Sequence, residues 1–99
     1  MAKLIWSPTA LTDLAALADY IGRDSEHYAR LFVQRIVSAV ETLASFPEAG
    51  RIVPEYGRRD LRELLFHNYR IVYRIKQNEV QVVAIVHGAR LLPDVEQEE

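Results

Sequence analysis

The sequence predicts an α+β domain in which two antiparallel helices cover one face of an antiparallel sheet. Apolar residues recur at helical spacing through the first half of its 99 residues, and apolar and polar residues alternate through part of the second half. Pro47, Gly50, Pro54 and Gly57 separate the two halves and predict a loop over residues 46–59. The length fits a single domain spanning residues 1–99.

The first half begins with a short predicted strand, Lys3–Trp6, and a helix start at Ser7-Pro8. Serine caps free backbone N–H groups, and proline at the first helical position sacrifices no hydrogen bond. An apolar stripe then continues to Gly22, where we expect the helix to stop; it consists of Leu11, Leu14, Ala15, Leu17, Ala18 and Ile21.

A second helix is expected after the capping sequence Asp24-Ser25-Glu26. Its longer apolar stripe runs to Leu43, and Pro47 ends it. Two apolar helices with a short polar link predict an antiparallel helical hairpin. The sheet is the element that remains to cover both stripes.

Three strands are expected in the second half, at 61–66, 69–76 and 80–86, and they form an antiparallel meander. Tyr69, Ile71, Tyr73 and Ile75 alternate with Arg70, Val72, Arg74 and Lys76, so both tyrosines are expected to pack beneath the helices. Trp6 and Phe66 are assigned to the core as well. The last strand is apolar at consecutive positions, which predicts a central strand covered on both faces.

Composition excludes several classes of protein. There is no cysteine, so disulfides and thiolate metal sites are impossible. The three histidines have no metal-ligand spacing, and no glycine-rich phosphate loop is present. No signal peptide and no apolar run of about 20 residues is apparent, so we expect a cytoplasmic protein without a membrane segment.

Charge is distributed unevenly despite a net charge of only −2. The last residues carry Asp94, Glu96, Glu98 and Glu99, and we expect a flexible acidic tail from about residue 94. Residues 51–76 are rich in arginine, which indicates either a binding surface or ordinary solvated charge. The whole chain is not basic enough to be a general nucleic-acid binder.

Five motifs in order resemble one family. They are the opening Ile5-Trp6-Ser7-Pro8-Thr9-Ala10, the helical Asp13-Leu14 with Asp19-Tyr20-Ile21, the junction Phe46-Pro47-Glu48-Ala49-Gly50-Arg51, the strands Leu61-Arg62-Glu63-Leu64 and Asn68–Arg74, and the end Val86-His87-Gly88-Ala89-Arg90. Over roughly residues 4 to 93 the chain resembles the RelE/ParE superfamily of bacterial toxins, and most of all its ParE-like members, known from plasmid-stabilisation systems.

The resemblance implies a toxin that a cognate, ParD-like antitoxin neutralises. It also implies one of two targets: ParE-like members poison DNA gyrase, and RelE-like members cleave mRNA on the ribosome. Neither branch uses a metal or an organic cofactor. A third possibility is an inactive module that only binds an antitoxin.

The resemblance also assigns candidate residues to a nuclease. Arg70 and Arg90 match the arginines of the third and fourth strands, Glu63 is a possible general base, and His87 is a possible acid or base. Leu61 and Glu63 occupy positions where RelE-like enzymes carry basic residues, and no tyrosine or histidine follows Arg90. These differences favour a non-enzymatic gyrase poison over a ribonuclease.

Contacts with a target or antitoxin are expected at six arginines of the second half and at one histidine: Arg58, Arg59, Arg62, Arg70, Arg74, His87 and Arg90. Arg70 and Arg74 should share a face as a cationic stripe. The alternatives are solvated arginines with buried stems, a salt-bridged loop formed by the Arg58–Arg62 region with Asp60 and Glu63, and a structural, hydrogen-bonded His87.

Overall fold

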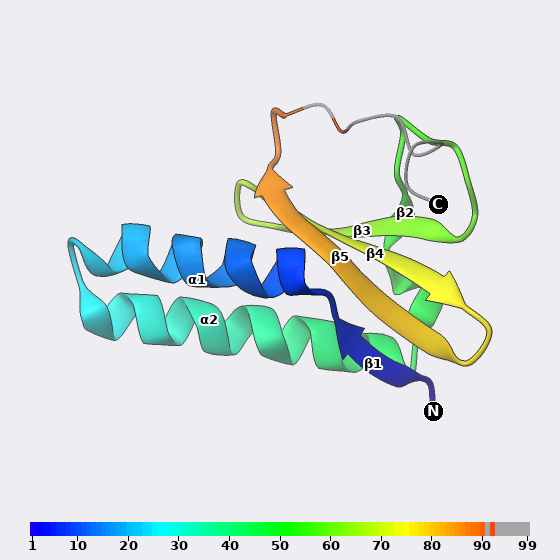
Figure 1. Ribbon diagram of the computed structural model, residues 1–99, viewed down its shortest axis with the longest axis horizontal. Coiled ribbons are helices and arrows are strands. Elements are labelled where there is room, and N and C mark those ends of the chain that lie inside the picture. The colour runs from blue at the N-terminus through cyan, green and yellow to red at the C-terminus, as the bar shows by residue number, and fades with distance from the viewer. Residues whose placement is uncertain (91, 93–99) are drawn as a thin grey trace.

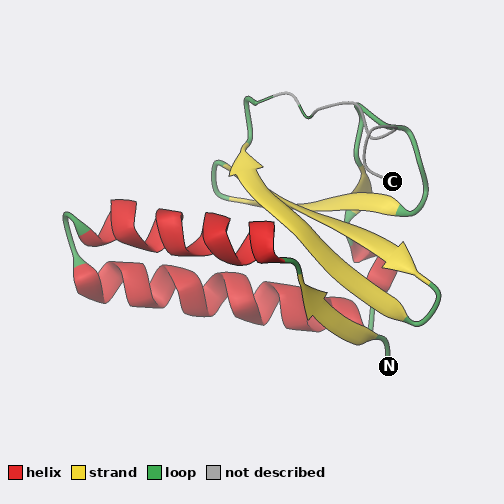
Figure 2. Ribbon diagram, viewed as in Figure 1, coloured by secondary structure: helices red, strands yellow, loops and turns green. Residues whose placement is uncertain are grey.

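The computed structural model describes residues 1–90 and 92 of the chain. Two helices lie side by side against one face of a strongly twisted sheet, as Figures 1 and 2 show. The predicted α+β class, with its helical hairpin and its antiparallel meander, is therefore confirmed. The acidic tail expected from about residue 94 lies outside the described residues.

The N-terminal half forms as its capping residues predict. Strand β1 (Lys3–Trp6) leads into helix α1 (Pro8–Gly22), and helix α2 (Glu26–Glu41) follows. Ser7 Oγ accepts a hydrogen bond from the amide of Ala10, and Ser25 Oγ accepts one from the amide of Tyr28. Both serines thus satisfy N–H groups that the first turn of a helix leaves free.

The sheet contains five strands in the order β1-β5-β4-β3-β2. After the short helical turns η1 (Thr42–Ala44) and η2 (Pro47–Ala49) come β2 (Arg51–Ile52), β3 (Leu61–Phe66), β4 (Tyr69–Lys76) and β5 (Glu79–His87). Strand β1 pairs in parallel with β5, and the other neighbours are antiparallel. The prediction of plain loop over residues 46–59 is wrong where β2 and η2 form, because a two-residue strand is too short to show an alternating pattern.

The core lies between the helices and the sheet. Its buried residues come from α1, α2, β4 and β5: Ala10, Leu17, Phe32, Ile36, Val40, Ile71, Val82 and Ile85. Tyr73 is fully buried beside Leu43 and Val80, and Tyr69, Trp6 and Phe66 pack against the core from its margin. The assignment of both tyrosines to the space beneath the helices is confirmed.

Strand β5 contains a bulge that changes which residues face the helices. Val72 pairs with Ala84 while Tyr73 pairs with Val82, so Val83 is an extra residue on β5. Val82 and Ile85 can therefore both point into the core although three positions separate them. The prediction that β5 is covered on both faces is wrong in part, because Val83, Ala84 and Val86 are only half-buried and line a hollow on the other face.

Candidate functional site

The candidate site lies on the face of the sheet that the helices do not cover. Alternation along β4 places Arg70, Val72 and Arg74 on this face, opposite the core residues Ile71 and Tyr73. The register brings Leu65, Glu63 and Leu61 of β3 next to them on the same face. The sequence prediction that Arg70 and Arg74 share a face is confirmed.

The loop between β2 and β3 folds back toward this face because its own residues form a tight turn. The amide of Val53 donates to the carbonyl of Leu61, and the amides of Tyr56 and Gly57 donate to the carbonyl of Val53. Gly57 has a φ of 63°, which glycine adopts without a steric penalty. The side chain of Val53 is fully buried, and it holds the loop against the sheet.

Arg70 and Glu63 form a buried ion pair at the centre of the site. Arg70 Nε donates to Glu63 Oε1 at 2.6 Å, and the two side chains are 6% and 0% exposed. Arg51 Nε donates to the second Glu63 oxygen at 2.5 Å from the neighbouring strand β2. Both oxygens of Glu63 are therefore engaged by guanidinium groups of the chain itself.

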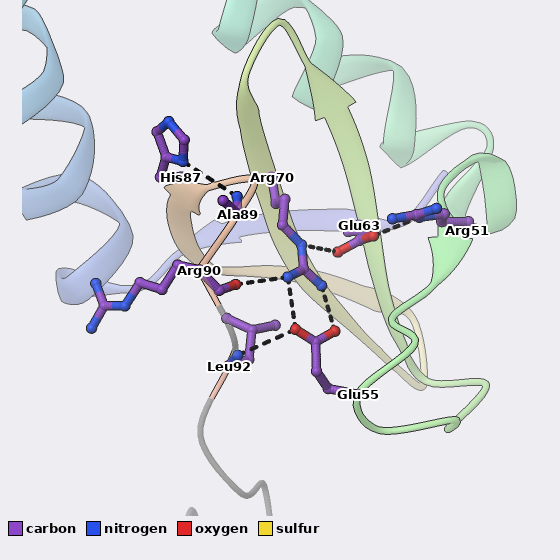
Figure 3. Close-up of polar contacts among 8 residues, drawn as sticks. All are labelled: Arg51, Glu55, Glu63, Arg70, His87, Ala89, Arg90 and Leu92. Carbon is purple, nitrogen blue, oxygen red and sulfur yellow. Dashed lines mark hydrogen bonds and ion pairs between the residues drawn. The ribbon is translucent and has the colours of Figure 1, made fainter.

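Glu55 completes this arrangement from the loop. Its oxygens accept hydrogen bonds from Arg70 Nη1 at 2.7 Å and from Nη2 at 2.6 Å, a bidentate pair (Figure 3). Arg70 Nη1 also donates to the carbonyl of Arg90 at 3.0 Å, and the amide of Leu92 donates to Glu55 at 3.2 Å. We call Arg51, Glu55, Glu63 and Arg70 the ion cluster; it holds two positive and two negative groups.

The contacts between Glu55 and Arg70 favour the charged state of both groups. Hydrogen bonds from Arg70 lower the pKa of Glu55 from 4.5 to about 2 and outweigh the opposing effect of desolvation. The bidentate bonds to Glu55, followed by the pairing with Glu63, raise the pKa of Arg70 against desolvation. Neither group is available as a proton donor or acceptor near neutral pH.

Two hollows flank Arg90, whose side chain is exposed. One of about 370 Å³ has an apolar floor of β4 and β5 residues and is bordered by Asp13, Tyr56 and Leu92. The other, of about 270 Å³, lies between α1 and the end of β5 and includes Tyr20 and His87. In Figure 3 the Arg90 carbonyl faces Arg70 while its guanidinium extends away from the ion cluster.

The candidate nuclease residues thus fall into two groups. Arg70 and Glu63 lie together, but each is bound to partners within the chain. His87 and Arg90 are exposed at the end of β5, and both border the second hollow. His87 Nδ1 accepts from the amide of Ala89 at 3.2 Å, and its ring meets that of Tyr69 edge-on.

The expectation of a free cationic stripe is wrong for Arg70, which is 5% exposed. The alternative of a solvated Arg70 is wrong for the same reason. Neither of these two interpretations of Arg70 included Glu55, which lies in a loop 15 residues earlier in the chain and binds the Arg70 guanidinium. Arg74 is half-buried, and its Nε is buried with no hydrogen-bond partner among the described residues.

Arg58 and Arg62, which the sequence places close together, have different partners in the folded chain. Arg58 pairs with Asp60 at 2.7 Å in an exposed contact. Arg62 donates to the carbonyls of Arg59 and Gly50 and lies on the opposite face of β3 from Glu63. The expected salt-bridged loop therefore holds for Arg58 with Asp60 but not for Glu63.

Sequence reasoning missed Glu55 and Arg51 as members of the site. Glu55 lies in a loop with no periodic pattern, and Arg51 lies in a strand of two residues. The available signal was chemical: a carboxylate and an arginine in a turn-rich segment, ahead of strands that carry a glutamate and an arginine among apolar residues.

No cluster of three or more potential metal-binding side chains occurs within residues 1–90 and 92. Over the same part of the chain, neither helix is long and apolar enough to cross a bilayer.

Comparisons with known proteins agree on one family. The sequence model described as "ParE toxin of type II toxin-antitoxin system, parDE" matches residues 4–92. The chain is 39% identical to "Toxin RelE2" of Caulobacter vibrioides over 92 residues, which cover 92% of this chain and all of that protein. It is 33% identical to "Putative toxin Y4kP" of Sinorhizobium fredii, with 94% and 95% of the two chains covered.

A solved structure supports the same grouping. A chain of the "Chromosomal ParDE TA system from P. aeruginosa" superimposes with a TM-score of 0.73 at 28% identity. The match covers 88% of this chain and 96% of that one.

Proposed function

The chain belongs to the ParE toxin family of type II toxin–antitoxin systems, and from this membership we propose that it inhibits DNA gyrase and is held inactive by a cognate antitoxin. One observation favours gyrase over RNA as the target of the toxin. The two groups that a RelE-like nuclease would use inside the sheet, Arg70 and Glu63, are buried and bound to each other.

Metal-free RNA cleavage needs a base for the 2′-OH and free cations for the phosphate. The oxygens of Glu63 accept from Arg70 and Arg51, and its side chain is 0% exposed. A phosphate that approached Arg70 would have to displace the bidentate carboxylate of Glu55. The ion cluster thus supports a structural role for both residues.

The surface that remains open suits a protein partner. Arg90 is exposed between two hollows, and valine, alanine and leucine side chains of the sheet line the floor of the larger of the two. An apolar surface bordered by the cation Arg90 and the carboxylate Asp13 can accept a peptide segment with apolar side chains and an acidic group placed against Arg90. We assign Arg90 to target contact on these grounds.

Purified full-length protein should inhibit supercoiling by gyrase and trap the cleaved DNA complex. Arg90→Ala should raise the concentration needed for inhibition about tenfold, the effect expected for one interface arginine. Arg30→Ala, at an exposed position on α2, is the matched control and should leave inhibition unchanged. Absence of inhibition and of trapped DNA at every ratio of toxin to gyrase would reject the gyrase target.

A ribosome-dependent mRNA endonuclease is the second candidate, because exposed His87 and Arg90 border one hollow. In that case primer extension on a translated mRNA would show cuts in the ribosomal A site, and His87→Gln would reduce them. If induced expression leaves growth normal, the chain is instead a silent antitoxin-binding module.

The antitoxin is proposed to be ParD-like, since the structural relative comes from a ParDE system. Co-expression of the chain with the product of a short reading frame found next to its gene should restore growth and yield a stable complex. A neighbouring product that neither binds the chain nor restores growth would contradict this partner.

A further inference from the structure

The segment after β5 is held to the body of the protein through the ion cluster. The amide of Gly88 donates to the carbonyl of Asn68 at 2.7 Å, which fixes the start of the segment. Beyond it, the Arg90 carbonyl accepts from Arg70, and the Leu92 amide donates to Glu55. The backbone contacts of Arg90 and of Leu92 therefore both depend on one pair of side chains, Arg70 and Glu55.

We infer that Glu55 and Arg70 form a latch that holds the backbone of Arg90 and of Leu92 beside the open face of the sheet and so directs the Arg90 side chain toward the target. Glu55 is then a positioning residue. The inference rests on the proposed function in one respect, namely that Arg90 contacts the target.

The geometry of Arg90 suits this role. Its backbone carbonyl is fixed by Arg70 at 3.0 Å, whereas its side chain extends away from the ion cluster and is exposed (Figure 3). A side chain on a fixed backbone loses less conformational freedom on binding than one on a loose segment. Release of the backbone would therefore weaken binding without the removal of any contact atom.

Glu55 is separable from the core, which makes the latch testable. It comes from the loop between β2 and β3, and its side chain is 18% exposed. Glu63 still pairs with Arg70 Nε in its absence, so the buried guanidinium keeps a carboxylate partner. One Glu55 oxygen, Oε2, accepts from both Arg70 Nη1 and the Leu92 amide, so a single substitution weakens both connections.

The first experiment measures hydrogen exchange of the full chain. Glu55→Gln removes the charge and keeps the shape, and Glu41→Gln removes a charge at the exposed end of α2 as the matched control. We expect the Leu92 amide to exchange about tenfold faster in Glu55→Gln only, because hydrogen bonds to charged groups are the stronger ones. The Leu92 amide exchanges by local opening, so a general loss of stability, which the slowest amides of β4 and β5 report, does not by itself change its rate.

The second experiment couples the latch to Arg90. Growth inhibition is measured at graded induction for the wild type, Glu55→Gln, Arg90→Ala and the double variant. We expect each single variant to be weaker than the wild type by about tenfold, and the double variant to be no weaker than Arg90→Ala, since coupled residues are not additive. A role of Glu55 in folding alone would instead add to the effect of Arg90→Ala.

The outcomes separate the latch from the proposed target. Unchanged exchange at Leu92 in both Glu55→Gln and Glu55→Ala overturns the latch. Faster exchange with additive growth effects overturns its link to Arg90. A wild-type chain that stops growth without an effect on gyrase rejects the gyrase target, while exchange and the growth cycle still decide the latch.

Discussion

The backbone amide of Gly50 donates a hydrogen bond to the hydroxyl of Tyr73 at 2.9 Å, and the same hydroxyl donates to the carbonyl of Pro47 at 2.6 Å. Tyr73 is fully buried, and its hydroxyl satisfies the buried amide of Gly50 and the half-buried carbonyl of Pro47. This contact fixes the junction after α2 to the centre of the sheet. It thereby places β2, and with it Arg51, beside Glu63.

Tyr73→Phe should lower the free energy of unfolding by about 1–3 kcal/mol, because it leaves the buried Gly50 amide without its acceptor and the half-buried Pro47 carbonyl without its donor. Urea denaturation followed by circular dichroism measures the loss. Tyr20→Phe is the control, since Tyr20 is 66% exposed and the change should stay within about 0.5 kcal/mol. Equal stability of Tyr73→Phe and wild type would show that the hydroxyl does not hold the junction.

Gly50→Ala should also destabilise the fold, for a steric reason. A Cβ at this position would lie 2.6 Å from the Glu63 carbonyl oxygen and 2.7 Å from the Tyr73 hydroxyl, and backbone cannot move aside as a side chain can. We expect a loss of about 1–3 kcal/mol in urea denaturation, typical of overpacking.

Gly22→Ala provides the opposite control, because its Cβ would meet Ala29 at an ordinary 3.8 Å at the end of α1. Alanine there should be neutral or stabilise by up to about 1 kcal/mol. A Gly50→Ala protein as stable as Gly22→Ala would refute the steric argument.

The elements of the fold could be predicted because each one carries a local pattern. Capping serines and apolar stripes locate α1 and α2, and alternation locates β4. The bulge at Val83 could not be predicted, because an unbroken apolar run shows the same composition with or without an extra residue. The two-residue β2 is set by pairing with β3 rather than by its own sequence.

The candidate site was predictable only in part. Alternation correctly placed Arg70 and Arg74 on one face, but it gives no information on burial or on charged partners from a loop. The burial of Arg70 depends on Glu55 and on the carbonyl of Arg90, which are 15 and 20 residues away in the chain. Long-range pairs of this kind require the folded arrangement.

The pairing of Glu63 with Arg70 predicts strong non-additivity. Glu63→Leu alone should cost about 3–5 kcal/mol of stability, because it leaves a buried arginine with one carboxylate fewer. The double variant Glu63→Leu/Arg70→Met should be more stable than Glu63→Leu, since hydrophobic side chains can replace a buried pair. Chemical denaturation of the wild type, Glu63→Leu, Arg70→Met and the double variant measures the coupling. If the losses of stability of the two single variants add up to that of the double variant, the two residues are not coupled.

The low pKa of Glu55 predicts how stability changes in acid. Its pKa is about 2 in the folded chain against an ordinary value of 4.5, so folding favours the charged form. The stabilisation is complete above pH 4.5 and is lost as the pH falls toward about 2. Glu55→Gln should lack this contribution at every pH.

The stability difference between wild type and Glu55→Gln should therefore be large at pH 7 and shrink at pH 3. Asp60, whose pKa is lowered by Arg58 in spite of desolvation, titrates equally in both proteins and cancels from the comparison. A difference that stays constant from pH 7 to pH 3 would show that the Glu55 charge does not stabilise the fold.

Asp13 on α1 closes the edge of β5 beyond the end of β1. The pairing of β1 with β5 ends at Trp6 and Val82. Beyond this point, side chains of α1 and its N-cap form hydrogen bonds with the backbone of β5. Ser7 Oγ donates to the Val83 carbonyl, and Asp13 Oδ2 accepts from the Ile85 amide at 2.9 Å. Asp13→Ala should leave the Ile85 amide free on a strand edge, which promotes pairing with another chain.

We expect Asp13→Ala to self-associate as its concentration rises, as measured by sedimentation velocity. Asp13→Asn keeps an oxygen that can accept the bond and should remain like the wild type. Asp19→Ala, at an exposed position on the same helix, controls for the loss of charge. If Asp13→Ala and Asp19→Ala sediment alike at every concentration, the carboxylate of Asp13 has no part in protecting this edge.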